Sequence, residues 1–191
     1  NRKSGKVKCR IIQTQEDGNY TKEIIDELDV VRGEIDWEGS PYCLVAVFER
    51  HGKNNNIALG LTTGAMIKRG AVATTYSHDA HNLIAVGKNA LDIVKAVNTI
   101  IDSQGGYCVV EDGKILAMLE LPIAGILSKE PMEQVARKVR KVRKAMGKLG
   151  YKHINSIMNL STLSLVASPE LKITDKGLVL VSKAQIVELK V

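Results

Sequence analysis

The sequence predicts an α/β (α+β) fold, a single compact domain over residues 1–191 in which a mixed β-sheet is flanked by helices. Three observations predict it. A chain of 191 residues is long enough to bury one substantial core. Short runs rich in Val, Ile and Leu, typical of strands, alternate with two helical patterns. No internal repeat and no low-complexity linker divides the chain.

The N-terminal part carries strand patterns and turn signals. Residues 7–12 and 42–48 combine Val, Ile and Leu with aromatic side chains and are predicted strands. Residues 21–31 lie between them, are acidic, and are expected to be irregular. Residues 52–56 (GKNNN) predict a turn, because Gly and Asn tolerate a left-handed backbone. An apolar run over residues 57–61 follows this turn.

The first predicted helix begins after Asn89, a suitable N-cap, and runs to about residue 103. Gly105-Gly106 ends it. The side chains expected on its buried face are Ala90, Val94, Val97 and Ile101. A hairpin of residues 107–110 and 114–119 is predicted next, because Asp-Gly at its centre favours a tight turn.

The second predicted helix is strongly basic. Ser128 is its expected cap, Pro131 occupies its first turn, where a missing N–H costs little, and Gly150 ends it. Its apolar stripe consists of Val135, Val139, Val142, Met146 and Leu149. Residues 131–150 carry seven Lys or Arg and one Glu, so this helix accounts for the whole net charge of +6. A solvated basic face is favoured over nucleic-acid binding, because no aromatic platform accompanies the charge. Beyond this helix, residues 178–191 are again strand-like.

Composition narrows the class of protein further. No apolar stretch reaches the roughly 18 residues of a membrane helix, so no membrane partner is predicted. The three cysteines, Cys9, Cys43 and Cys108, are an odd number without a CxxC pair. They indicate reduced thiols and a cytoplasmic protein, and they argue against a structural zinc site.

The segment with the most chemistry is His78-Asp79-Ala80-His81-Asn82, which two short apolar runs flank. Polar groups between strands are costly to bury unless they are paired or used. Histidine titrates near neutral pH and a neighbouring carboxylate can orient it, so an acid/base or substrate-contact role is favoured. A metal site at His78 and His81, with Asp79 as ligand or support, is disfavoured because a short loop makes a poor cage. The alternative interpretation, a polar loop whose side chains only cap the neighbouring strands, stays open.

Two other motifs have simpler interpretations. Glu49-Arg50-His51 ends a strand, and a solvated strand end with a local ion pair is slightly favoured there. Gly60, Gly64 and Gly70 match neither a P-loop nor a dinucleotide fingerprint, so turn geometry is their expected role.

Six motifs occur in order within a stretch, residues 7–181, that resembles a known family over nearly the whole chain. They are Glu49-Arg50-His51 (ERH), Gly64 with residues 68–74 (KRGAVAT), His78-Asp79-Ala80-His81-Asn82 followed by LIAVG, Gln104-Gly105-Gly106, residues 121–125 (LPIAG) and residues 169–177 (PELKITDKG). Together they resemble the C-terminal domain of bacterial and archaeal adenine deaminase. The departures from that pattern are Met66, Ala80, Asn159, Thr162 and Val166, which bear on substrate specificity rather than on the fold.

The resemblance implies hydrolytic deamination of adenine to hypoxanthine and ammonia in purine salvage. In that family a metal-binding amidohydrolase barrel precedes this domain, and its manganese or iron activates a water that attacks C6 of the purine. The barrel's ligand set, an HxH followed by a later His and Asp, does not occur in this sequence. The implied partners are therefore an amidohydrolase barrel, as a domain or subunit, and a purine substrate. No cofactor is expected in this chain itself. Whether the protein forms a homo-oligomer stays an open question.

Within this chain the predicted catalytic residues are His78, Asp79 and His81, with roles unassigned. The predicted substrate-binding residues are Asn82, Ser77 and His51, and no residue is a predicted metal ligand. The loop over residues 77–82 should be ordered between two strands, with both histidines partly exposed toward a docked barrel. Two alternatives stay open: a stand-alone purine-binding or regulatory module without activity, and a small hydrolase with its own metal at His78 and His81.

Overall fold

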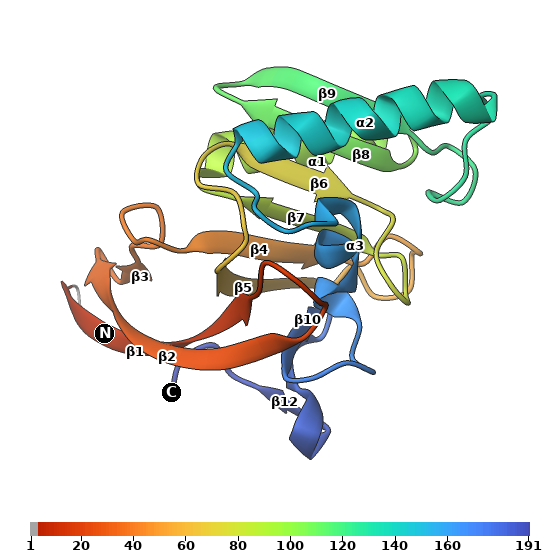
Figure 1. The fold of residues 1–191 in the computed structure, drawn as a ribbon. Coiled ribbons are helices and arrows are strands. Elements are labelled where there is room, and N and C mark those ends of the chain that lie inside the picture. Colours follow the sequence, from red (N-terminus) through yellow and green to blue (C-terminus); the bar gives the residue numbers. More distant parts are fainter. Residues whose placement is uncertain (1–3) are drawn as a thin grey trace.

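The computed structural model describes residues 4–191 (Figure 1). The strands of the main sheet are β1 (Ser4–Thr14), β2 (Thr21–Val31), β3 (Glu34–Ile35), β4 (Cys43–Phe48), β5 (Ile57–Thr63), β6 (Ala71–Thr74), β7 (Leu83–Gly87), β8 (Gly106–Glu111) and β9 (Lys114–Glu120). The remaining elements are α1 (Ala90–Asp102), α2 (Met132–Lys148), α3 (Ser156–Ser161), the 3-10 turns η1 (Thr162–Ser164) and η2 (Val181–Lys183), and the strands β10 (Leu171–Thr174), β11 (Gly177–Leu180) and β12 (Gln185–Val187).

Within the described residues, the main sheet has nine strands in the order β3-β2-β1-β5-β4-β7-β6-β8-β9. Neighbouring strands are antiparallel except β1 and β5, which are parallel where they pair. The mixed sheet flanked by helices that the sequence predicted is therefore confirmed.

The acidic segment of residues 21–31 is a strand, so the prediction that it is irregular was wrong. β2 pairs with β1 along its whole length, from Ser4↔Val31 to Thr14↔Thr21, and the pair forms the long curved red and orange ribbon in the lower half of Figure 1. Leu28 of β2 is buried, whereas Asp26 and Asp29 are exposed. Charged side chains can stay in water on one face while the β1 ladder satisfies the backbone, so the tertiary pairing outweighs local strand propensity.

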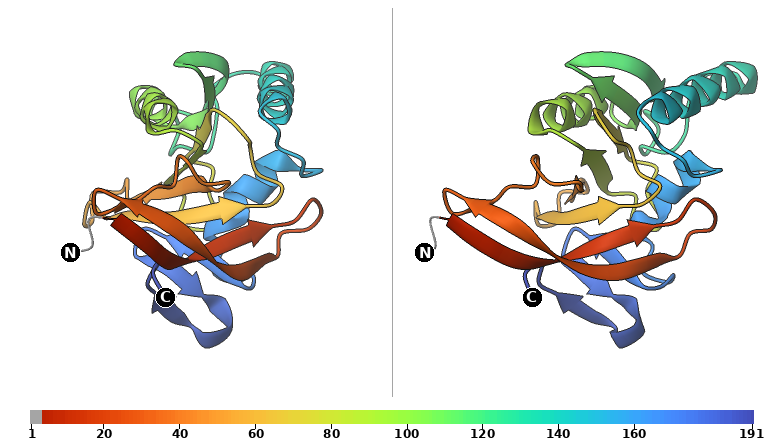
Figure 2. Two further views of the ribbon diagram at one scale, coloured as in Figure 1. Left: turned by 90° about the vertical axis from the view of Figure 1, so that its left-hand side faces the viewer. Right: turned by 60° about the vertical axis from the view of Figure 1, so that its left-hand side comes forward.

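The helices α1 and α2 cover opposite faces of the sheet (Figure 2). Ala71 and Ala73 of β6 pack in the cluster that contains Ile93 of α1. Val72, between them along the strand, packs in the cluster that contains Met146 of α2. Successive side chains of a strand point to opposite faces, so β6 is buried on both sides.

The buried face of α1 differs from the predicted one. The cap at Asn89 is confirmed, because its Oδ1 accepts the N–H of Asp92 at 2.8 Å. Of the four side chains expected inside, Ala90, Val94 and Ile101 are exposed and only Val97 is buried. The side chains that face the sheet are Ile93, Ala96, Val97 and Ile100. The carboxylate of Asp92 accepts N–H groups from the β8–β9 turn, at Asp112 and Gly113, and this contact turns the helix toward that face.

The basic helix α2 begins later than expected. Pro131 is its N-cap residue, while the Ser128 hydroxyl accepts the N–H of Glu130 at 3.1 Å in the turn before the helix, so the predicted Ser128 cap was wrong. The predicted apolar stripe is confirmed: Val142, Met146 and Leu149 are buried, and Val135 and Val139 pack against the same core. Gly150 follows with φ +100°, as a helix-ending glycine should.

Turn chemistry agrees with the sequence at several points. The hairpin of β8 and β9 ends at Glu111↔Lys114, and Asp112 and Gly113 both take positive φ, as a two-residue Asp-Gly turn requires. Gly64 and Gly70 also have positive φ and serve turns. Gly60 does not, because it lies inside β5, where Ile173 and Leu178 approach its backbone closely.

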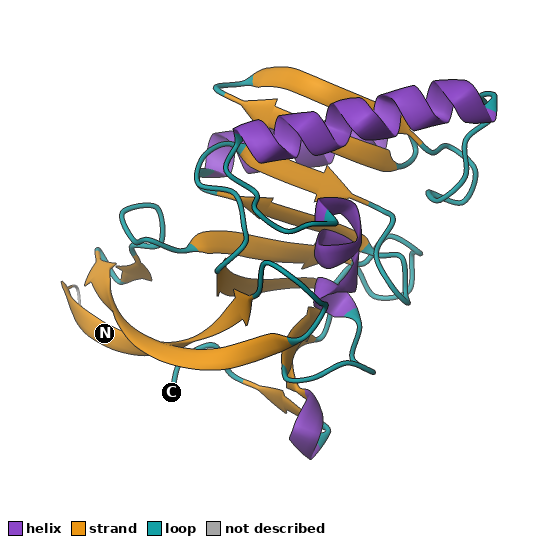
Figure 3. Ribbon diagram, in the orientation of Figure 1, coloured by secondary structure: helices purple, strands orange, loops and turns teal. Residues whose placement is uncertain are grey.

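The C-terminal segment forms a second sheet, β10-β11-β12, which is antiparallel and packs below the main one (Figure 3). The strand-like tail predicted over residues 178–191 is thus confirmed only in part, since η2 interrupts it. The last residues return to β1, where the N–H of Arg10 donates to Leu189 O at 2.8 Å.

Candidate functional site

Residues 75–82, here called the histidine loop, join β6 to β7 at one end of the main sheet. The last β6–β7 pair is Thr74↔Ile84, so the polar residues are forced beyond the strand ends. The N–H of His81 donates to Ser77 O at 2.7 Å and closes the turn. His81 takes φ +50°, a left-handed conformation that histidine adopts more readily than most residues. The predicted ordered loop between two strands is confirmed.

Three rings gather on this loop. The ring centroids of Tyr76 and His78 lie 5.2 Å apart, those of His78 and His81 5.4 Å, and those of Tyr76 and His81 6.0 Å. Both histidines are half-buried, so the expected partial exposure is confirmed. Their rings are fixed by one another and by Tyr76, yet remain within reach of a ligand or partner.

The segment from α3 to η1 supports the loop from below. The N–H of His78 donates to Ser161 O at 2.9 Å. The hydroxyl of Ser164 donates to His78 O at 2.8 Å and lies 2.6 Å from the hydroxyl of Ser77. These bonds hold the backbone on both sides of the His78 ring.

The end of β4 supports the loop from the side. The guanidinium of Arg50 donates through Nε to His81 O at 2.5 Å and through Nη2 to Ala124 O at 2.6 Å. It also packs against Gly125, where an added Cβ would lie 2.6 Å from Nη2. His51 is exposed, and its Nε2 lies 2.8 Å from Ala80 O. Arg50 therefore ties the histidine loop to the turn of residues 121–127.

The prediction of a local ion pair at Glu49-Arg50-His51 was wrong, because Glu49 and Arg50 bind backbone groups instead of each other. The Glu49 carboxylate accepts backbone N–H groups of His51 at 2.5 Å and Lys53 at 2.9 Å, and so organises the following turn. Arg50 serves the histidine loop instead. The two charged neighbours point to opposite sides of the strand end because adjacent side chains alternate.

Asn82 and Asp79 line a cavity together with Ser164, and neither histidine of the loop lines it. Asn82 is buried, and its Nδ2 donates to Asp175 Oδ1 at 3.1 Å. Asp79 is exposed and, within residues 4–191, has no ion pair within 4.0 Å. The predicted site residues therefore share one loop, but the loop presents the rings and the carboxylate to different surroundings.

The pKa of His81 lies below the ordinary histidine value. Burial is the largest cause, and the neighbouring His78 and Arg50 charges act in the same direction. The Thr75 backbone and the Asp79 carboxylate oppose the shift. The N–H of Ser77 points at His81 Nδ1 at 3.3 Å, which suits a neutral ring with an unprotonated Nδ1. The lowered pKa and the N–H at Nδ1 both favour the neutral imidazole form of His81.

We expect this charge state to be visible by NMR titration of the histidine Hε1 signals. His81 should titrate below about 6.5, the ordinary value. Since the unfolded chain then binds the proton more tightly, this group leaves the free energy of unfolding unchanged above pH 6.5 and lowers it as the pH falls further. Arg50→Met should raise the pKa of His81, whereas Arg69→Met, a control that removes an arginine bonded to Glu111, should not. Titration of His81 at or above 6.5 in the unmodified chain would contradict the assignment.

Potential metal ligands are dispersed in the part of the chain that the structure describes. Among residues 4–191, no three His, Cys, Asp or Glu side chains are gathered closely enough to hold an ion. The expectation that the isolated chain binds no transition metal tightly stays a prediction, which elemental analysis after dialysis can test. About one equivalent of metal, lost on His81→Ala, would overturn it.

Several residues of this site escaped the sequence analysis. Tyr76, Ser161, Ser164 and Asp175 carry no catalytic pattern of their own, and three of them lie more than 75 residues beyond the loop. Only the motif around Asp175 (TDKG) and the aromatic neighbour Tyr76 offered a signal. Arg50 was quoted as part of the ERH motif, but its role depends on a contact that sequence spacing does not reveal.

The fold and the loop define a class of protein: an α+β domain that displays histidines, a carboxylate and an amide at one end of a mixed sheet. Comparison with known proteins gives the family. The sequence profile described as "Adenine deaminase C-terminal domain" matches residues 19–185. The chain belongs to the adenine deaminase C-terminal domain family.

Individual relatives agree with the profile. The chain is 50% identical over 188 residues to adenine deaminase 2 of Shouchella clausii, covering 98% of this chain and 33% of the relative. It is 50% identical over 189 residues to adenine deaminase of Clostridium perfringens, covering 99% of this chain and 33% of the relative. Adenine deaminase of Moorella thermoacetica is 39% identical over 185 residues, covering 96% and 31%. The chain spans about a third of the length of the curated relatives it matches.

Proposed function

We propose that this chain acts as part of an adenine deaminase, in which its histidine loop completes or covers a catalytic site held by the remaining two thirds of the protein. The observation that carries the proposal is the contact of Arg50 with both His81 O and Ala124 O. It joins the ERH, HDAHN and LPIAG motifs into one surface, although they are widely separated in the sequence. Family membership supplies the reaction class.

The proposed reaction adds water to adenine and releases hypoxanthine and ammonia. It therefore requires a proton to move from the attacking water to the departing nitrogen. A neutral His81 can accept a proton at a ring nitrogen and return it, and His78 stands close enough to share that task. Exposed Asp79 can stabilise the imidazolium that forms. These three residues are the proposed catalytic groups of this chain.

The substrate-binding residues are proposed on different grounds. Asn82 offers a buried amide oxygen that accepts no hydrogen bond from the described residues. His51 is exposed beside Ala80 and can contact a base from the loop's edge. The Ser77 hydroxyl is buried and bonded to Ser164, so we assign it a positioning role within the substrate site.

The remaining components of the proposal concern the rest of the protein. A metal-binding amidohydrolase barrel would hold the manganese or iron that the family resemblance implies, and this chain contributes no step through that metal. Three buried free thiols support a cytoplasmic location, and the role in purine salvage rests on the family alone. No helix within residues 4–191 has the length and apolar character needed to cross a membrane.

The test is complementation. We expect the 191-residue chain to release no ammonia from adenine by itself, with or without added Mn²⁺. Mixed or co-expressed with the preceding two thirds of the Clostridium perfringens relative, it should restore turnover, whereas a His78→Ala/His81→Ala chain should not.

Two outcomes would contradict the proposal. Robust turnover by the chain alone, surviving repurification, would favour a small independent hydrolase. Full activity of the preceding two thirds without this chain would favour a binding or regulatory module.

A further inference from the structure

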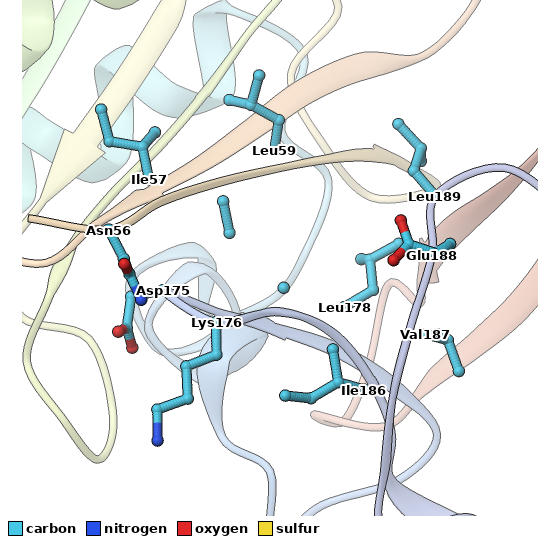
Figure 4. A pocket seen from close by; sticks show the side chains of 12 residues that line it. Asn56, Ile57, Leu59, Asp175, Lys176, Leu178, Ile186, Val187, Glu188 and Leu189 are labelled. Atoms are coloured by element: carbon cyan, nitrogen blue, oxygen red, sulfur yellow. The ribbon is translucent and has the colours of Figure 1, made fainter. Parts of the chain in front are cut away.

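Lys172 of β10 is fully buried, with 0% of its surface exposed. Lysine usually keeps its ammonium group in water, as the exposed Lys176 does on the same hairpin, where it lines the groove in Figure 4. Among the described residues, no carboxylate lies within 4.0 Å of Lys172 Nζ. Burying a charge without a counter-charge is costly, so packing alone does not account for a lysine at this position.

The ammonium group of Lys172 joins two separate parts of the backbone. Its Nζ donates to Asn19 O at 2.9 Å, in the turn between β1 and β2. It also donates to Thr162 O at 3.1 Å, where α3 ends and η1 begins. Hydrogen bonds from an ionised donor are roughly twice as strong as neutral ones. Lys172 therefore fixes residues 161–164, here called the α3–η1 corner, against the β1–β2 turn.

The corner that Lys172 holds is also the support of His78. Ser161 O, one peptide unit before Thr162 O, accepts the N–H of His78 at 2.9 Å. Ser164, at the other end of the corner, donates through its hydroxyl to His78 O at 2.8 Å. A movement of the α3–η1 corner would therefore reach the His78 backbone on both sides of its ring.

The charge of Lys172 opposes the stability of the fold. Burial, and no neighbouring charge, lowers the pKa of Lys172 from its ordinary value of 10.5 to about 8. The folded state thus releases this proton before the unfolded chain does, so this group raises the free energy of unfolding as the pH rises from about 8 to about 10.5. A neutral amine suits the fold better, whereas the two hydrogen bonds are strongest from the ammonium.

We propose that Lys172 is a positioning residue for His78: its ammonium group fixes the α3–η1 corner, and the corner fixes the backbone that aims the His78 ring. The catalytic role of His78 rests on the proposed function, whereas the connection from Lys172 to His78 does not. Arg50 supports the other histidine of the loop through His81 O. The histidine loop is thus held by two cations, each of which binds backbone carbonyls rather than carboxylates.

The first experiment measures amide hydrogen exchange in the isotope-labelled 191-residue chain. Lys172→Met keeps an unbranched apolar side chain of similar length and removes the donor. It should lower the exchange protection of the His78 and Leu165 amides at least about tenfold, the effect of losing one good hydrogen bond. Leu165 is a suitable probe because its N–H donates to Thr162 O at 3.2 Å. Lys176→Met is the matched control and should leave both amides unchanged.

A kinetic measurement separates positioning from stability. In the enzyme complemented with the preceding two thirds of the Clostridium perfringens relative, Lys172→Met should lower kcat per folded molecule at least about tenfold, with little change in KM. Lys176→Met should keep both values. A residue that served only the fold would reduce the folded fraction and leave kcat of the folded molecules unchanged.

A pH titration of the unmodified chain keeps the test decisive if Lys172→Met does not fold. The NMR signal of Lys172 Cε reports the charge of the amine, and the pKa it gives should lie near 8. Protection of the His78 amide, corrected for faster intrinsic exchange in base, should fall at the same midpoint because a neutral donor bonds more weakly. The Gly113 amide, which donates to Asp92 Oδ1 at 2.8 Å, is the control and should not respond there.

Other charged groups on the elements around Lys172 determine a further control. They are Arg10 of β1, Glu16 and Asp17 of the β1–β2 turn, Lys22 and Glu23 of β2, Lys152 and His153 before α3, Glu170 before β10, and Asp175 and Lys176 after it. The ring of His153 is buried, and its Nε2 lies 2.9 Å from Gly18 O, next to Asn19. His153→Ala should therefore leave the midpoint shared by Lys172 and His78 unchanged.

Three results would overturn the proposal: unchanged protection of His78 in Lys172→Met, a Lys172 titration to which the His78 amide does not respond, or undiminished kcat of the folded variant. The exchange measurements need no catalysis, so they separate the two proposals. Complementation without coupling between Lys172 and His78 would overturn only this inference. Coupling without complementation would overturn the proposed function and leave the connection to His78 intact.

Discussion

Replacing His81 with alanine at the matching position of a full-length relative, such as the Clostridium perfringens enzyme, is expected to lower kcat for adenine deamination at least about 100-fold. A positioned acid/base group contributes roughly 10²–10⁴-fold, and His81 is the neutral, half-buried ring of the loop. His78→Ala should act in the same range, since the two rings contact each other. Ammonia release from adenine is the measurement.

Stability should change little in these variants, because both rings are partly solvated and contribute few core contacts. The control is His153→Ala, which removes a buried histidine whose Nε2 bonds to Gly18 O rather than to the loop. That variant should keep its turnover per folded molecule. If the loop variants instead unfold the domain while folded molecules keep full activity, the loop is only a strand cap.

Gly64→Ala is expected to destabilise the domain by about 4 kcal/mol or more, which is near the upper end for single substitutions. Gly64 follows β5 with φ +91°, and an added Cβ would lie 2.0 Å from Thr14 O and 3.0 Å from Thr14 N. Thr14 is the end of β1, and its hydroxyl bonds to both Thr63 O and the N–H of Ala65. Relieving the clash would separate β1 from β5, which pair in parallel. Urea unfolding followed by far-UV circular dichroism gives the free energy of unfolding.

Gly113→Ala provides the matched comparison. Gly113 also has positive φ, at +72°, but an added Cβ there meets nothing within 4 Å. Only the left-handed backbone then opposes alanine, at about 1–2 kcal/mol. Equal losses at the two positions would show that conformation, rather than the close approach of Thr14, governs Gly64.

Sequence reasoning succeeded where the determinant is local. The positions of the histidine loop, the α1 cap at Asn89 and the Asp112-Gly113 turn follow from residues within a few positions of one another. Each depends on short-range chemistry: an apolar run long enough for one strand, a side chain that caps a helix, and a backbone that tolerates positive φ. The structure confirms all three.

Sequence reasoning failed where contact with a distant part of the chain determines the local structure. β2 is a strand because β1 pairs with every residue of it, although its acidic composition favours neither element. The buried face of α1 is displaced by about one residue because Asp92 binds the β8–β9 turn some 20 residues later. Local periodicity shows how apolar side chains repeat along an element. Which of them are buried depends on the surface that other elements provide.

The candidate site divides in the same way. The sequence by itself determined the residue types, their order on one short loop, and the family that carries them. Only the tertiary structure decided which groups support and surround that loop: Arg50 on His81 O, Ser164 on His78 O, and Asp175 on Asn82. These contacts join residues 31 to 93 positions apart. Hydrogen bonds between residues so far apart in the sequence depend on how sheets and helices pack. No local sequence pattern therefore predicts their partners.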